Sequence, residues 1–173
     1  MIRKGSRAIS ETLISSDVFK QSMRLLAGGV CVAATNSSGE WHGLTTTAVC
    51  SLTMDPPSLI TCVNREAGAH SILIETKRVS INVLSHDHMG LAELFSSPEV
   101  KGPDRFDKKK WIEMASGVPA LVDALAVLDC NVIREIAVGQ HSVFFCEVKS
   151  VRLQPERRPL VHFNREFCAI QPA

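Results

Sequence analysis

Residues 43–51 of the chain read Gly43-Leu44-Thr45-Thr46-Thr47-Ala48-Val49-Cys50-Ser51. Threonine and valine are good strand formers, so the run by itself is typical of an ordinary β-strand. Its side chains are also small and rich in hydroxyl groups, and they leave the backbone amides open to a ligand. A planar heteroaromatic ring that carries a phosphate needs donors of this kind. The run therefore predicts either a plain strand or the edge of a nucleotide-like site.

The segments on both sides of this run favour a chain made mainly of strands. Residues 30–35 are apolar and β-branched, and the turn signal at residues 36–39 predicts a hairpin with residues 43–52. Asp55-Pro56-Pro57 interrupts the chain, because proline lacks an amide donor and restricts the residue before it. Further strands are expected at residues 58–63, 78–84, 125–138, 141–153 and 160–170.

Short helices are expected between the strands. Ser16 or Asp17 is suited to cap a first helix, and Gly28-Gly29 ends it. The apolar positions of this helix follow one-face spacing: Phe19, Met23, Leu26 and Ala27. Two more helices are expected at residues 67–77 and 88–95, and a polar loop at residues 96–110. Six or seven strands with short helices predict a mainly β fold, an antiparallel barrel that is closed or nearly closed.

Length and charge limit the classes of function. A chain of 173 residues suits one domain, here residues 16–173, with residues 1–15 as a polar N-terminal arm. The net charge of +1 argues against a nucleic acid or an anionic membrane as partner. No apolar run approaches the roughly 20 residues that span a bilayer, and residues 1–10 do not resemble a signal peptide. The expected location is the cytoplasm.

Motifs of several enzyme classes are missing from the sequence. The six cysteines are scattered without a C-x-x-C pair, which is typical of buried reduced thiols. His86-Asp87-His88 has no further ligands at a recognisable spacing, so no metal site is expected. The sequence has no G-x-G-x-x-G, P-loop or G-x-S-x-G motif, and no convincing nucleophile–base pair. If the protein is an enzyme, its reactive group is expected to come from a cofactor.

A second candidate segment is residues 61–71, where a strand ends, a small-residue loop turns and a helix begins. Asn64, Arg65, His70 and Ser71 add side-chain donors there, which suits a phosphate, whereas Glu66 suits one only if it points away. Such turns are common, so this segment is weak evidence alone. His141 follows a tight Gly139-Gln140 turn and is either an exposed turn residue or one that reaches a cleft.

Taken in order along the chain, these pieces resemble the short-chain flavin reductase family, whose fold is the FMN-binding split barrel. The resemblance covers about residues 18–170. Its matching pieces are residues 23–30, the 43–51 run, Leu52-Thr53-Met54-Asp55-Pro56-Pro57, Cys62-Val63-Asn64-Arg65, Ile81-Asn82-Val83-Leu84, Asp104-Arg105-Phe106, Gly117-Val118-Pro119-Ala120-Leu121, Gly139-Gln140-His141 and Phe163-Asn164-Arg165-Glu166-Phe167. It implies an antiparallel Greek-key barrel with flanking short helices and a homodimer with flavin near the subunit interface. It also implies hydride transfer from NADH or NADPH to FMN, or to FAD, with the reduced flavin supplied to a partner monooxygenase. The pyrimidine-degradation type is the most similar subgroup.

The resemblance also assigns residues to parts of the ligands. Thr45, Thr46, Thr47 and Ala48 are expected to line the isoalloxazine, with Cys62 and Val63 packing beneath it. Residues expected toward the ribityl–phosphate end are Ser51, Asn64, Ala67 and His70, with Lys101 and Arg105 as weaker phosphate candidates. His141 matches a position that meets the nicotinamide, and Arg165 matches an arginine in the last strand.

The sequence departs from the family pattern at three places. Thr46-Thr47-Ala48 stands where members usually carry Thr-Ala-Ser, so the ring contacts are expected to shift. Gln140 replaces the usual acidic residue, and Phe167 stands where tyrosine is common. Two alternatives stay open, a non-catalytic flavin- or haem-binding barrel and a reductase of the corrinoid type, because a fold does not fix a function.

Overall fold

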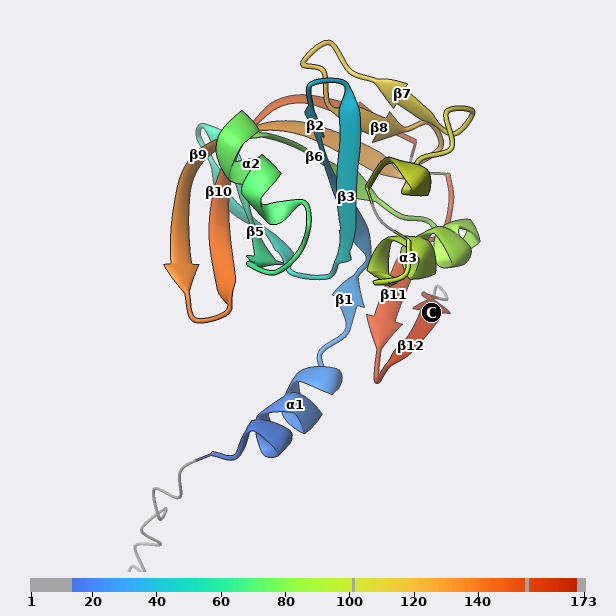
Figure 1. The fold of residues 1–173 in the computed structure, drawn as a ribbon. Helices are drawn as coiled ribbons and strands as arrows, with labels where there is room; N and C mark the ends of the chain where they lie inside the picture. The colour runs from blue at the N-terminus through green and yellow to red at the C-terminus, as the bar shows by residue number, and fades with distance from the viewer. Residues whose placement is uncertain (1–13, 101, 155, 171–173) are drawn as a thin grey trace, which may run out of the picture.

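The computed structural model describes residues 14–100, 102–154 and 156–170, and its centre is a seven-stranded antiparallel sheet that curls on itself (Figure 1). The order across the sheet is β3-β2-β6-β9-β10-β5-β4. The strands are β2 (Cys31–Ser37), β3 (Glu40–Thr46), β4 (Val49–Met54), β5 (Pro57–Asn64), β6 (Arg78–Val83), β9 (Ala126–Val138) and β10 (His141–Leu153). β6, β9 and β10 are successive neighbours in the sheet. β5 precedes all three in the chain but lies beside β10, and this order makes a Greek-key arrangement. The prediction of a mainly β split barrel is confirmed.

The two edge strands of the sheet, β3 and β4, are joined by only two residues, Thr47 and Ala48. An extended chain advances at most about 3.6 Å per residue, so the two edges come within about 11 Å of each other here. No ladder pairs β3 with β4, which leaves the barrel split along this seam. The 43–51 run therefore crosses the seam.

The prediction of one strand at residues 43–52 was wrong, because this stretch contains the end of β3 and the start of β4. Thr46 Oγ1 accepts a hydrogen bond from the Ala48 amide at 3.0 Å, which turns the backbone out of the ladder. The predicted hairpin of residues 30–35 with the start of this run is confirmed as β2 and β3, with Asn36 paired to Trp41.

The predicted last strand was also wrong in part. It is a hairpin of β11 (Leu160–Phe163) and β12 (Glu166–Ala169), and β1 (Gly28–Gly29) pairs with β11. Asn164 and Arg165 form its turn, with φ values of 49° and 71°. A small pair, β7 (Trp111–Glu113) and β8 (Pro119–Leu121), was not predicted.

Within the described residues, three α-helices flank the barrel: α1 (Ser16–Arg24), α2 (His70–Thr76) and α3 (Met89–Ser96). Two short 3₁₀ turns, η1 (His86–His88) and η2 (Gly102–Arg105), lie on either side of α3 in the chain. The N-cap of α1 is Ser15, whose hydroxyl accepts from the Val18 amide, and not Ser16 or Asp17 as expected. α1 buries none of its residues and projects from the barrel (Figure 1).

The core has two buried clusters. One is centred on the aromatic rings of Phe95, Phe106 and Trp111, whose centroids are 4.9 to 5.5 Å apart. The other lies beneath α2 and includes Leu73 and Phe144. Cys31, Cys130 and Cys146 are buried as predicted, whereas Cys50 and Cys168 are exposed and Cys62 is half-buried. In the described part of the chain, every helix is too short or too polar to cross a membrane.

Candidate functional site

Two hollows flank the seam between β3 and β4. The first, here called the Arg105 cavity, has a volume of about 540 Å³ and is lined by residues 42–45, 66–69, 95–98, 102 and 105. The second, here called the α1 groove, has a volume of about 830 Å³ and is lined by residues 19, 20, 23, 24, 26–29, 47–50, 60, 62, 162 and 165. Both fall in the range of small-molecule sites. The predicted site residues nearest the seam therefore divide between two adjacent hollows.

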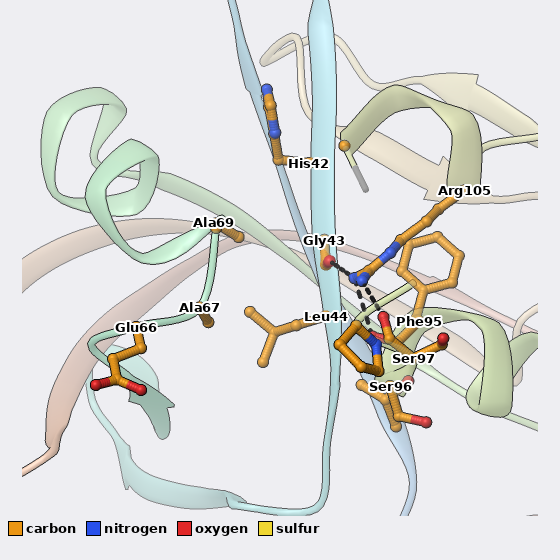
Figure 2. A pocket seen from close by; sticks show the side chains of 14 residues that line it. His42, Gly43, Leu44, Glu66, Ala67, Ala69, Phe95, Ser96, Ser97 and Arg105 are labelled. Carbon is orange, nitrogen blue, oxygen red and sulfur yellow. Dashed lines mark hydrogen bonds between the residues drawn. The ribbon is translucent and has the colours of Figure 1, made fainter. Parts of the chain in front are cut away.

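Arg105 forms one wall of its cavity. The acceptors of its hydrogen bonds are all backbone carbonyls. Nη1 donates to Gly43 O at 2.9 Å and to Phe95 O at 3.0 Å, and Nη2 donates to Ser97 O (Figure 2). Nε donates to Val100 O at 2.7 Å. These bonds hold the segment after α3 against β3.

The Arg105 guanidinium has no carboxylate within ion-pair distance among the described residues. Burial lowers the pKa of Arg105, yet an arginine stays protonated at neutral pH. Its positive charge is therefore available to an anion in the cavity.

The loop opposite Arg105 offers backbone donors. The Gly68 and Ala69 amides have no acceptor among the residues that the structure describes, whereas the Glu66 amide is bound to Asn64 Oδ1 at 2.9 Å. Figure 2 shows the Glu66 carboxylate pointing away from Arg105. A phosphate monoester fits this set of donors, because Gly68, Ala69 and Arg105 line the same cavity.

The α1 groove offers a flatter and less polar surface. Thr47 and Ala48 are exposed there, and the thiols of Cys50 and Cys62 come from the paired strands β4 and β5. A Cβ atom on Gly28 would lie 3.1 Å from Thr47 Cβ, so a larger residue at this position would have to push Thr47 aside by a few tenths of an ångström. A planar ring fits such a floor of small side chains.

The three threonines of the run have different surroundings. Thr45 lines the Arg105 cavity, with its hydroxyl donating to Ala92 O at 2.7 Å, while Thr46 is buried and Thr47 faces the α1 groove. Val63 lies fully buried under this region. The roles expected of these residues toward the isoalloxazine stay predictions.

Several other predicted residues lie outside both linings. His70 is buried, and its Nε2 atom lies 2.8 Å from Ser142 Oγ, which occupies that ring nitrogen. Ser51 is exposed on β4. Asn64 and His141 are exposed and are Cα partners at the ends of β5 and β10.

The remaining predicted residues lie in the linings, apart from one. Ala67 and Arg105 line the first hollow, and Cys62 and Arg165 line the second. Lys101 lies outside the described residues.

Sequence reasoning missed two basic residues of the site, Lys20 and Arg24, which line the α1 groove. Their spacing of four residues on a capped helix was the signal that would have placed them on one face. The interpretation of Arg165 as a last-strand residue was wrong, since it occupies the β11–β12 turn.

The fold and the two hollows define a split-barrel protein with a site suited to a phosphorylated ring compound. The flavin reductase like domain model matches residues 23–171, and the chain belongs to this family. The resemblance inferred from the sequence and the predicted enzyme class are confirmed.

Relatives and solved structures agree with this membership. The chain is 33% identical to the FMN reductase (NADH) RutF of Pantoea ananatis, over 92% of this chain and 84% of that protein. It is 34% identical to the RutF of Acinetobacter baylyi, over 90% and 82%. The NADH:FAD oxidoreductase SgcE6 of Streptomyces globisporus, solved with NAD and FAD fragments, superposes with a TM-score of 0.83 at 26% identity, over 90% and 93% of the two chains.

Proposed function

We propose that the protein is an NADH-dependent flavin reductase that uses FMN as its flavin. The observation that carries this proposal is the position of the two hollows, one with donors for a phosphate and one with a floor for a ring, on either side of residues 45–48. The names of the RutF relatives and of SgcE6 support the same pair of substrates. FAD and NADPH are the alternatives.

The proposed mechanism depends on positioning by the protein. A bound flavin would supply the ring that accepts the hydride. The Gly68 and Ala69 amides and Arg105 would hold the phosphate, while Thr47 and Ala48 would support the ring. Bringing the two ring systems together in one groove makes the transfer effectively first-order.

The proposal extends to assembly and to the fate of the reduced flavin. α1 exposes Phe19 by 59% and Met23 by 46%, and an apolar stripe of this kind is suited to a second copy in a homodimer. The structural neighbour BorF is the flavin reductase component of a two-component tryptophan halogenase, with a TM-score of 0.85 at 26% identity, over 92% of this chain and 100% of BorF. We expect this protein likewise to supply reduced flavin to a monooxygenase, in the cytoplasm, with residues 16–173 as the working domain.

The experiment is an anaerobic titration of the protein and FMN with NADH, followed by flavin absorbance. Bleaching at a catalytic amount of protein supports a reductase, and no bleaching with NADH or NADPH supports the alternative of a non-catalytic flavin- or haem-binding barrel. Arg105→Lys keeps the charge but loses most of the hydrogen bonds to the four backbone carbonyls, so the segment after α3 is no longer fixed against β3 and FMN binding is expected to weaken about tenfold. The matched control is Arg134→Lys, which changes an exposed arginine on β9.

A further inference from the structure

A third hollow is separate from the two hollows of the proposed flavin site, because it shares no lining residue with either of them. Here called the His88 cavity, it has a volume of about 500 Å³, which is within the range of small-molecule sites. Its lining comes from η1 and α3, from residues 109–110 and from residues 121–123. The proposed reductase mechanism makes no use of this cavity.

The His88 cavity has an apolar floor. Leu91 and Leu94 come from one face of α3, three residues apart, and Leu121 and Val122 complete the floor. Leu121 is fully buried and Val122 is 39% exposed, so the floor runs from the core to the surface. The lining residue Gly90 leaves space open, since an added Cβ atom would have no heavy atom within 4 Å. An aromatic ring or a short aliphatic chain fits a floor of this kind.

The two acidic residues of the lining are bound by groups of the protein. Arg157 Nη1 lies 3.3 Å from Asp123 Oδ2 and 3.4 Å from Asp87 Oδ2. His88 Nε2 lies 3.1 Å from Asp123 Oδ1, while the Ser85 amide donates to His88 Nδ1 at 3.1 Å. Burial by itself raises the pKa of Asp123, but His88 and Arg157 bring it below its ordinary value. Asp123 is therefore a carboxylate whose charge is met from within the protein.

The two lysines of the lining have no such partners. Lys109 and Lys110 are exposed, and neither has a carboxylate within ion-pair distance in the described part of the chain. Three cations, the two lysines and Arg157, therefore accompany two aspartates at this cavity. The excess positive charge favours an anionic group beside the apolar floor.

α3 connects the His88 cavity to the proposed flavin site. Its leucines line the His88 cavity, whereas Phe95, on the same helix, lines the Arg105 cavity. Two carbonyls of α3 accept hydrogen bonds from the flavin side: Thr45 Oγ1 donates to Ala92 O at 2.7 Å, and Arg105 Nη1 donates to Phe95 O at 3.0 Å. A group packed on the leucines therefore restrains the helix that fixes Arg105.

We propose that the His88 cavity binds a small apolar carboxylate and that an occupied cavity strengthens FMN binding through α3. The carboxylate pairs with Lys109 and Lys110, and the hydrocarbon part packs on the leucines. The binding stands on the cavity alone, whereas the effect on FMN rests on the flavin reductase function proposed above. Coupling between two sites is reciprocal, so FMN raises the affinity for the carboxylate by the same factor.

The first test uses benzoate as the probe and benzamide as its neutral analogue. Calorimetry should show benzoate binding to the FMN-saturated protein, in which the flavin site is already occupied. Benzamide should bind about fivefold more weakly, because it lacks the charge. The double variant Lys109→Gln, Lys110→Gln should weaken benzoate binding by about the same factor and leave benzamide binding unchanged. Lys108→Gln is the matched control, since it changes the same run of lysines outside the lining.

The second test fills the cavity from α3. Gly90→Leu places a side chain in the open space and should abolish benzoate binding, whereas the control Gly90→Ala should keep it. Saturating benzoate should raise the FMN affinity of the wild-type protein about fivefold and leave that of Gly90→Leu unchanged. Melting temperatures of the two variants check that both are folded.

Three results would overturn the proposal. Equal benzoate binding by the wild-type protein and the double lysine variant would remove the lysines from the site. Loss of benzoate binding in the presence of FMN would place the probe in the flavin site, and an FMN affinity that benzoate does not change would exclude the coupling. If the wild-type protein oxidises neither NADH nor NADPH, the reductase function fails instead, and benzoate binding to the flavin-free protein still tests the cavity.

Discussion

The Nε2 atom of His70 lies 2.8 Å from the hydroxyl oxygen of Ser142, and both side chains are buried. His70 is the first residue of α2 and follows Ala69 of the Arg105 cavity, while Ser142 follows His141 on β10. A serine with no exposed surface is not a nucleophile for an external substrate. The pair instead connects the proposed phosphate loop to the strand that carries His141.

Ser142→Ala should therefore destabilise the protein. It leaves the buried His70 nitrogen without its partner, and an unsatisfied buried polar group costs about 1–3 kcal/mol. Urea unfolding measures the loss, and Ser150→Ala, at an exposed position of the same strand, is the control. Equal midpoints for the two variants would show that the hydrogen bond contributes nothing.

His141→Ala should raise the apparent KM for NADH more than it weakens FMN binding. His141 is exposed at the start of β10, and its Cα partner is Asn64 at the end of β5. Steady-state kinetics and a flavin titration measure the two effects, with exposed His86→Ala as the control. Unchanged NADH kinetics would remove His141 from the site.

Gly43→Ala should destabilise the protein and weaken FMN binding together. An added Cβ would lie 2.9 Å from Phe95 Cε1 and 3.1 Å from Ala33 O, and overpacking of this kind costs about 1–3 kcal/mol. The displaced Phe95 also lines the Arg105 cavity. Gly90→Ala, on α3 with nothing within 4 Å of its added Cβ, should be neutral or stabilising. Matching melting temperatures for the two variants would contradict this account.

Local sequence signals predicted most of the barrel but not its seam. The turn signal at residues 36–39 and the polar–apolar alternation in residues 78–84 can each be recognised within a few residues. The strands that they indicate, β2, β3 and β6, were therefore predicted. The break at Thr47-Ala48 depends on one side-chain hydrogen bond and on the meeting of two distant edges. A continuous β-prone run carries no sign of either.

Sequence reasoning was least successful for side chains whose partners are far along the chain. His70 carried the donor signal of a phosphate ligand, but its nitrogen is bound to a residue 72 positions away. Arg105 was expected at the phosphate, and the structure adds its bonds to four carbonyls, including that of Gly43, 62 positions away. Such pairs are set by tertiary packing.

Thiol reagents should separate the three buried cysteines from the two exposed ones. Burial raises the pKa of Cys31 and Cys146 to about 12 and also raises that of Cys130, so these thiols stay protonated and covered. Iodoacetamide at pH 8 should modify Cys50 and Cys168 first, as measured by peptide mass spectrometry. If FMN occupies the α1 groove, excess FMN should protect Cys50 and leave Cys168 reactive. Equal protection of both would argue against the ring position.

The buried thiols also predict a loss of stability in alkali. In the unfolded chain a thiol loses its proton near pH 8.5, whereas Cys31 and Cys146 hold theirs to about 12 in the folded protein. The unfolded state therefore binds fewer protons above pH 9, so the unfolding free energy falls as pH rises. Urea unfolding from pH 7 to 10 should show this slope. Cys31→Ala should reduce the slope and Cys168→Ser should not, and equal slopes in all three proteins would contradict the assignment.

Because Thr47 and Ala48 both join the sheet edges and face the proposed ring, architecture and chemistry share one short piece of chain. An inserted residue there would spread the edges and pull the two hollows apart at once. Substitutions that change the ligand preference are therefore expected in the walls of the two hollows, at α1, at the β11–β12 turn and after α3. The length of the Thr47-Ala48 link is expected to stay fixed.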